Sequence, residues 1–142
     1  MDKKLQTVIE TLRENNCTCV VATPRGKTVA SSLEGVMPIL QLLRDGDSLR
    51  NATVADKVVG RAAAMLLAHG GVHSVYGRVM SEGALAFLRE NSIAARCETL
   101  VPVILNADGT DVCPLEKRVA KLRLPIQAFL LFDALMPRRG SD

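Results

Sequence analysis

Residues 53–71, TVADKVVGRAAAMLLAHGG, contain the strongest helical pattern in the chain. Thr53 and Asp56 have the spacing of a capping box, with aspartate in place of the usual glutamate. Gly70 and Gly71 are typical of a helix C-terminus. Between these ends, apolar residues recur on one face at helical spacing, namely Val58, Ala62, Met65 and Leu66. The pattern predicts a single helix from residue 53, and its run of glycine and alanine would let it approach a sheet closely.

Shorter elements precede this helix. Apolar residues at Leu5, Val8, Ile9 and Leu12 predict an amphipathic helix that stops near residue 15. Residues 17–22 are apolar and β-branched, and residues 27–31 follow a Pro-Arg-Gly turn, so these two segments predict a β-hairpin. A short helix is predicted after Gly35, with Pro38 in its first turn, where proline is tolerated, and residues 44–47 end it.

Strands and helices alternate after residue 71. Residues 72–79 predict a strand, residues 81–91 a helix, and residues 93–103 a strand that breaks before Pro102. Further helices are expected after Cys113 and from Pro125. Such alternation implies right-handed crossovers and parallel strands, whereas the opening hairpin makes the sheet mixed. We therefore predict an α/β fold, a three-layer α/β/α sandwich with a small mixed sheet, as one domain over residues 1–136 with a tail at 137–142.

Composition limits the classes of function. The 142 residues carry a net charge of +3, which permits an anionic ligand but is weak for nucleic-acid binding. Aromatic rings are scarce, which argues against a base-stacking surface; they are Tyr76, Phe87, Phe129 and Phe132. The N-terminus lacks a signal-peptide pattern, and the most apolar stretch, residues 126–136, is too short to span a bilayer. We expect a cytoplasmic protein that binds neither nucleic acid nor membrane.

The four cysteines, at positions 17, 19, 97 and 113, do not suggest a disulfide framework. Cys17 and Cys19 lack the spacing of a metal or redox pair. Two residues apart on a strand, they are expected on the same face, as small buried apolar side chains.

Several blocks of this sequence carry a resemblance to a known family. They are VADKVVGRAAA at 54–64, VYGRVMSEGAL at 75–85, LVP at 100–102 and CPLE at 113–116. Together with the strand at 18–21, they resemble a small prokaryotic family of unknown function that is placed in the cytidine-deaminase-like fold. The resemblance covers roughly residues 3–120. The chain departs from the family at Ala107, where an arginine that would bind an anion is expected, and at Leu115, where methionine is expected.

The resemblance implies a fold and the place of a pocket, not a reaction. Deaminases of this fold hold zinc with His and Cys at the N-termini of two helices that flank the central strands. By order of elements, the equivalent residues here are 55–57 and 80–82, and none of them is His or Cys. His69 and His73 lie away from these places. Because a zinc site needs three or four N or S ligands, we expect neither zinc nor another cofactor.

The helix N-termini are nevertheless where we expect a ligand. Open α/β sheets bind ligands at the carboxyl ends of their strands, and helix N-termini there offer free N–H groups. The candidate ligand-binding residues are Asp56, Lys57, Ser81, Glu82, Cys113 and Glu116.

Each candidate also has a structural explanation. Asp56 lies beside the pocket or is the acid of the capping box. Lys57 binds an anion, acts as a proton-transfer group of lowered pKa, or is simply solvated. Ser81 lacks a histidine base and is most simply an N-cap, and Glu82 is favoured by the helix dipole.

Cys113 precedes Pro114 at a helix N-terminus, a position that lowers a thiol pKa and makes the thiolate reactive. It is either a nucleophile or an unreactive cysteine, and Glu116 is either a ligand-binding group or an acid of the first turn. A metal-independent enzyme would use Cys113 or Lys57 as its catalytic residue.

The last helix is apolar nearly all round, so it needs cover on more than one side. We predict that it is buried in a homodimer or inserted between layers. The leading hypothesis is an uncharacterised protein that binds a small anionic or nucleotide-like ligand without zinc, with Tyr76 as the ring near the ligand. The alternatives are a metal-independent enzyme and a non-catalytic oligomeric interaction protein.

Overall fold

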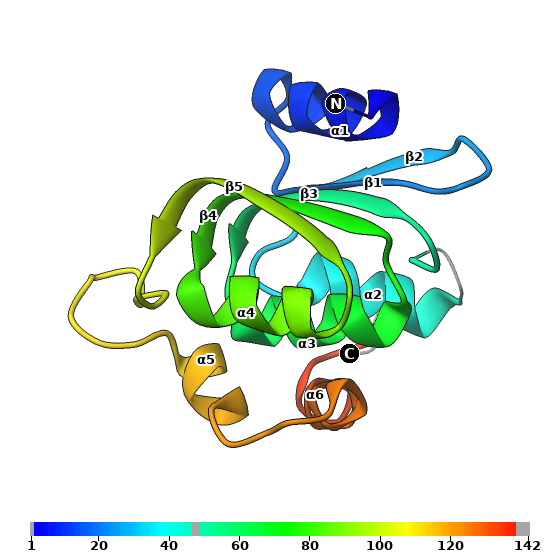
Figure 1. Ribbon diagram of the computed structural model, residues 1–142. Helices are drawn as coiled ribbons and strands as arrows, with labels where there is room; N and C mark the ends of the chain where they lie inside the picture. The colour runs from blue at the N-terminus through cyan, green and yellow to red at the C-terminus, as the bar shows by residue number, and fades with distance from the viewer. Residues whose placement is uncertain (1, 47–48, 139–142) are drawn as a thin grey trace.

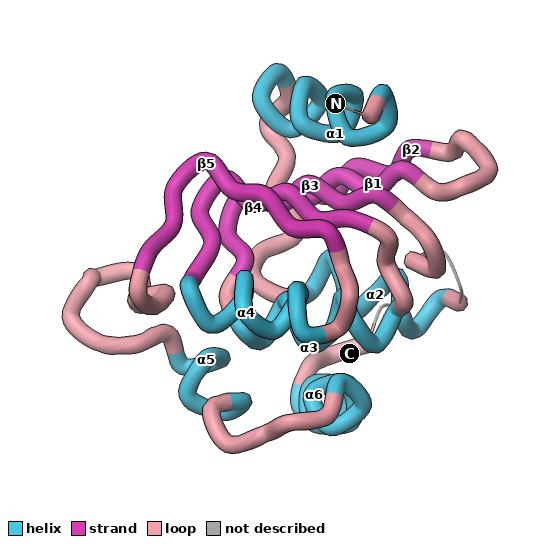
Figure 2. Tube along the Cα trace, in the orientation of Figure 1, coloured by secondary structure: helices cyan, strands magenta, loops and turns pink. Residues whose placement is uncertain are grey.

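The computed structural model describes residues 2–46 and 49–138 and has a sheet at its centre (Figure 1, Figure 2). Helix α1 (Lys3–Glu14) lies on one face of the sheet. Helices α2 (Met37–Asp45), α3 (Arg61–Gly70) and α4 (Glu82–Glu90) cover the other face. The molecule is therefore the three-layer α/β/α sandwich that the sequence predicts.

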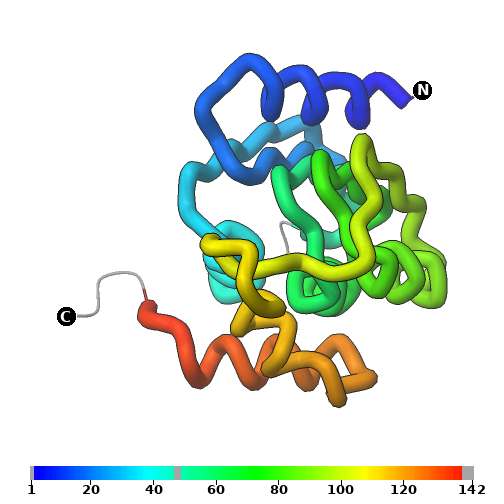
Figure 3. Tube along the Cα trace, turned by 90° about the vertical axis from the view of Figure 1, so that its left-hand side faces the viewer, coloured from blue at the N-terminus to red at the C-terminus, as the bar shows by residue number. Residues whose placement is uncertain are grey.

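Two further helices lie outside these layers. Helices α5 (Pro114–Val119) and α6 (Pro125–Leu135) both pack on α3. Seen from the side, α1 and α6 lie on opposite sides of the sheet (Figure 3).

The sheet has five strands in the order β2-β1-β3-β4-β5. They are β1 (Cys19–Ala22), β2 (Thr28–Ser31), β3 (Thr53–Val59), β4 (Ser74–Ser81) and β5 (Ala94–Val101). β1 is antiparallel to both β2 and β3, whereas β3, β4 and β5 are parallel. The predicted hairpin and the predicted parallel crossovers are both confirmed.

The predicted start of the helix within residues 53–71 is wrong. Residues 53–59 form β3, which pairs with β1 and β4, and α3 begins at Arg61. β-branched residues at 53, 54, 58 and 59 favour the strand, and a strand buried on both faces has no clean alternation to reveal it. Thr53 and Asp56 therefore form no capping box, and the Thr53 hydroxyl instead accepts a hydrogen bond from Ser74 Oγ at 3.3 Å. The predicted C-terminus is confirmed, because Gly71 caps α3 with φ +76°.

Apolar side chains form a separate core on each face of the sheet. The predicted apolar face of α1 packs on β1, Ala55 and Tyr76, and the larger core lies under α2, α3 and α4. Cys17 belongs to the α1 side and Cys19 to the other, so the prediction that they share a face is wrong. β1 begins only at Cys19, so the strict alternation of a strand does not extend back to Cys17. Before the strand, the Thr18 hydroxyl donates a hydrogen bond to Ser31 O at 3.1 Å.

Helix α6 lies outside α3 and α2, so insertion between layers is wrong. Ala128 and Phe132 are buried, and the Phe129 ring stacks on His69 with centroids 4.9 Å apart. Large apolar side chains on its outer surface stay exposed, namely Leu124, Ile126, Leu130 and Leu135. Their burial in a homodimer stays a prediction.

Arg44 attaches the C-terminal end of α6 to α2. Its side chain is 8% exposed and its Nε lies 2.7 Å from Asp133 Oδ1. The guanidinium also donates to the carbonyl oxygens of Asp133, Met136 and Pro137 at 3.0, 3.0 and 2.8 Å. The hydrogen bond from Arg44 is the main reason why the pKa of Asp133 is lowered. One side chain thus satisfies several carbonyl groups at the end of α6.

Replacing Arg44 with alanine is expected to lower the free energy of unfolding by about 1–3 kcal/mol, because the carbonyl groups and Asp133 lose their donor. Urea unfolding measures the change, and Arg44→Lys, which keeps the charge but not the fork of donors, should recover only part of it. A loss below about 0.5 kcal/mol would show that solvent replaces these hydrogen bonds without cost.

Candidate functional site

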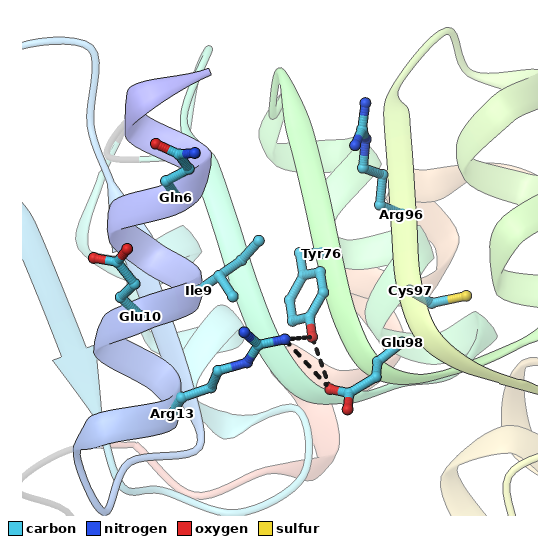
Figure 4. Close-up of a pocket in the computed structure, with 8 residues that line it drawn as sticks. All are labelled: Gln6, Ile9, Glu10, Arg13, Tyr76, Arg96, Cys97 and Glu98. Carbon is cyan, nitrogen blue, oxygen red and sulfur yellow. Dashed lines mark hydrogen bonds and ion pairs between the residues drawn. The ribbon is translucent and has the colours of Figure 1, made fainter. Parts of the chain in front are cut away.

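A groove of about 440 Å³ lies between α1 and β5, above β4 (Figure 4). It exists because α1 packs mainly on β1 and β3 and leaves the outer part of the sheet uncovered. Ile9 and Tyr76 provide apolar surface, and the polar lining comprises Gln6, Glu10, Arg13, Arg96 and Glu98. The groove therefore combines an apolar centre with groups of both charges.

Three side chains from separate elements meet at one end of the groove. The Tyr76 hydroxyl donates to Glu98 Oε2 at 3.0 Å and accepts from Arg13 Nη2 at 3.5 Å. Arg13 Nη2 also lies 3.8 Å from Glu98 Oε2, and both of these side chains are about half exposed. This arrangement links α1, β4 and β5 and holds the Tyr76 ring in place (Figure 4).

Arg96 lies toward the other end of the groove, and its side chain points away from this group (Figure 4). Its guanidinium forms no hydrogen bond or ion pair with another residue in the described ranges, and the same is true of the Gln6 side chain. An arginine with free donors can bind a carboxylate or a phosphate through two parallel hydrogen bonds. The groove can thus hold a small molecule that carries an anionic group.

The structure separates Asp56 from Lys57. They are consecutive residues of β3, so their side chains point to opposite faces of the sheet. Asp56 pairs across the strands with Cys19, whose side chain belongs to the core under α2 and α3. The helix N-terminus expected at these residues lies instead at Gly60.

Asp56 is a buried carboxyl group with an incomplete set of partners. It is 5% exposed, Oδ1 accepts a hydrogen bond from Val58 N at 3.4 Å, and Oδ2 has no partner among the described residues. Burial raises the pKa of Asp56 to about 7, against the opposing effect of the backbone N–H groups of Val58 and Lys57. Burial, together with the nearby charge of Asp56, also raises the pKa of the Cys19 thiol.

Ser81 and Glu82 lie at the start of α4. The Ser81 hydroxyl accepts a hydrogen bond from Ala84 N at 3.0 Å, so Ser81 has the N-cap role that the sequence favours. Glu82 is the exposed acid of the first turn.

Cys113 and Glu116 are brought together at the N-terminus of α3. They line a cavity of about 80 Å³ with Gly60 and Val58. The Glu116 carboxylate accepts hydrogen bonds from Arg61 N at 2.7 Å and from Ala62 N at 3.0 Å. Glu116 thus caps α3 from a separate helix, a role that the sequence did not predict.

Helices α3 and α4 therefore use acceptors from this chain at their N-termini. Glu116 satisfies two N–H groups of α3, and Ser81 satisfies one of α4. These groups are not free for an anion, whereas the arginine in the groove is. The geometry therefore favours the groove over the helix N-termini as the candidate site.

Sequence reasoning missed most of the groove. Arg13, Arg96 and Glu98 come from segments far apart in the sequence and form no motif. Tyr76 could be found, because it is the single tyrosine of the chain and the ring expected near a ligand. In the described ranges, no group of three or more His, Cys, Asp or Glu side chains is arranged to hold a metal ion. No helix there has the length and hydropathy needed to cross a membrane.

Comparison with known proteins gives a family but no activity. A DUF1893 family protein from Thermotoga maritima, known from a crystal structure at 2.70 Å, has a similar fold, with a TM-score of 0.86. The two chains are 24% identical over 96% of this chain and 92% of that one. No match was found among curated proteins. The sequence profile described as Domain of unknown function (DUF1893) matches residues 7–136, so the chain belongs to this family.

Proposed function

We propose that the chain binds a small anionic ligand in the groove between α1 and β5. The observation that carries this proposal is the free guanidinium of Arg96, which lines the same groove as the hydrogen-bonded group of Arg13, Tyr76 and Glu98 at its other end. The ligand site that we expected at the helix N-termini is thereby moved to the opposite face of the sheet. We also propose that the fold is cytidine-deaminase-like and lacks the zinc ligands of the deaminases.

The lining of the groove indicates the chemistry of the ligand. Arg96 supplies paired donors for a phosphate or carboxylate group. Ile9 and Tyr76 line the groove but are only 7% and 6% exposed, so they offer a small apolar contact, and the Tyr76–Glu98 pair offers hydrogen-bonding atoms beside it. A small polar ligand with an anionic end, such as a sugar phosphate or a nucleoside monophosphate, matches these three features. Binding sites of a few hundred Å³ are ordinary for such ligands.

A thermal-shift screen of inorganic phosphate, nucleoside monophosphates, sugar phosphates and dicarboxylates tests the proposal. A ligand that binds the folded chain should raise Tm with concentration, and calorimetry then gives its Kd. Arg96→Ala is expected to weaken binding about tenfold or more, because a charge-assisted hydrogen bond is lost. The variant should fold normally, since Arg96 makes no described contact that stabilises the chain.

Arg25→Ala is the matched control, because Arg25 is an exposed arginine in the turn between β1 and β2, away from the groove. Equal losses of affinity in Arg96→Ala and Arg25→Ala would show nonspecific attraction to positive charge. Absence of any Tm shift across the screen would refute the proposed function.

A further inference from the structure

The outer edge of the sheet ends in a long strand. β5 comes last in the strand order and is twice as long as β2 at the opposite edge, with eight residues against four. Side chains at 94, 96, 98, 99 and 100 are exposed. An edge strand presents a row of unpaired N–H and C=O groups, which another strand can bind.

The sequence of β5 is complementary to itself when a second copy runs antiparallel. Placing Cys97 opposite Cys97 of the second copy sets Arg96 opposite Glu98, and Glu98 opposite Arg96. The same register sets Ala95 opposite Thr99 and Ala94 opposite Leu100. Residues directly opposite in an antiparallel pair lie on the same face of the sheet, close enough to interact. Both oppositely charged pairs therefore form on the face that carries the groove.

The charges on β5 are available for this pairing. Arg96 has no hydrogen-bond or ion-pair partner within residues 2–46 and 49–138. The Glu98 side chain is 51% exposed, and the hydrogen bond and ion pair described for it both involve Oε2. Edge strands that avoid association usually carry charged side chains such as lysine, proline or a bulge, and a charge opposes pairing when the facing strand offers no counter-charge. β5 instead carries opposite charges two residues apart, which attract an antiparallel copy.

We propose that a second copy of this chain pairs with β5 by antiparallel strand addition centred on Cys97, which joins the two sheets into one. The partner's Glu98 then lies beside Arg96 at the mouth of the groove, so each copy contributes a residue to the other's site. Arginine has five N–H donors, so Arg96 can contact the partner's Glu98 and still bind an anion. The pairing does not rest on the proposed function, because it requires no ligand.

Sedimentation of the full chain over a range of concentrations up to about 100 µM is expected to show a monomer–dimer equilibrium. Arg96→Glu places two carboxylates opposite each other in both pairs and should weaken the dimer at least about tenfold. Glu98→Arg should do the same with two arginines. The double variant Arg96→Glu/Glu98→Arg restores opposite charges and should restore the dimer.

Cross-linking tests the register. In the proposed pairing, the two Cys97 Cα atoms are about 4.5–5.5 Å apart, so a short bismaleimide should link them. Cys97→Ser should abolish the cross-linked dimer, and Cys113→Ser, which removes the other partly exposed thiol, should leave it unchanged.

The proposal would be overturned by a monomer throughout the concentration range, by a dimer that the single charge reversals do not weaken, or by a cross-link that does not need Cys97. A dimer that is insensitive to Arg96→Glu but lost in Leu130→Glu would place the interface on the exposed face of α6 instead. Failure of the double variant to recover the dimer would exclude the Arg96–Glu98 pairing.

Discussion

Replacing Asp56 with asparagine is expected to stabilise the folded chain by about 2–4 kcal/mol near pH 8. In the wild-type chain this carboxyl group is buried, and Oδ2 has no partner among the described residues. Asparagine keeps the shape and the acceptor for Val58 N but carries no charge at any pH. It therefore removes the penalty of a buried ion without leaving a cavity, and the burial of its Nδ2 donors where Oδ2 has no partner among the described residues keeps the gain below the full cost of the ion.

The pH dependence follows from the pKa of Asp56, which burial raises from 3.8 to about 7. Between these two values the unfolded chain has released its proton, whereas the folded chain still holds it. Asp56 therefore lowers stability progressively as the pH rises from about 4 to about 7, and the full penalty persists above that range. The Asp56→Asn variant should lack this fall, and the two proteins should be similarly stable near pH 4.

Urea unfolding of both proteins at several pH values measures the difference. Taking the difference removes the contributions of groups that both proteins share, such as Asp133, whose lowered pKa gives the opposite slope at acid pH. Asp111→Asn is the control, because Asp111 is exposed and hydrogen bonding from Lys117 lowers its pKa. An Asp56→Asn variant that is less stable than wild type near pH 8 would mean that the carboxylate has a donor or cation in solution.

The local patterns of the sequence predict most of this fold, but they assign the residues of β3 wrongly to a helix. The amphipathic face of α1 and the prolines of α2, α5 and α6 indicate these helices correctly. At 53–71, however, a buried central strand runs into a helix with a single glycine between them. Apolar residues occur on both sides of Gly60, so helical spacing can be followed backwards from the helix into the strand. The valines at 54, 58 and 59 and the break at Gly60 are the signals that favour a strand.

The candidate site was less predictable, because it depends on which elements become neighbours. The six predicted residues share expected positions at helix N-termini, but the N-terminus expected at Asp56 lies at Gly60, because residues 53–59 form β3. The acceptor that caps α3 comes from Glu116, which is 55 residues away from Arg61 in the chain. The groove likewise requires the packing of α1 against the sheet. Such contacts between distant segments leave no local pattern in one sequence.

Replacing Glu116 with alanine is expected to lower the free energy of unfolding by about 2–4 kcal/mol, since two charge-assisted hydrogen bonds to the α3 backbone are lost. The carboxylate also compensates the positive end of the helix dipole. Arg61 also joins α3 to the α5 segment, because its Nη1 donates to Val119 O at 3.1 Å and to Leu122 O at 2.9 Å. Glu116→Gln, which keeps one acceptor, should lose less than Glu116→Ala in urea unfolding.

A substitution at Gly60 tests whether Glu116 stabilises α3 through its hydrogen bonds and not through packing in general. A Cβ atom at residue 60 would lie 2.5 Å from Glu116 Oε1, so alanine there must displace the carboxylate from both N–H groups. Gly60→Ala should therefore destabilise the wild-type chain by about 1–3 kcal/mol but have little effect in the Glu116→Ala background, where the clash is absent. Gly83→Ala in α4, where a Cβ meets nothing within 4 Å, is the matched control and should be neutral or slightly stabilising. Additive losses from Gly60→Ala and Glu116→Ala would show that the carboxylate does not hold the N-terminus of α3 in solution, because a shared contact must give a coupling energy.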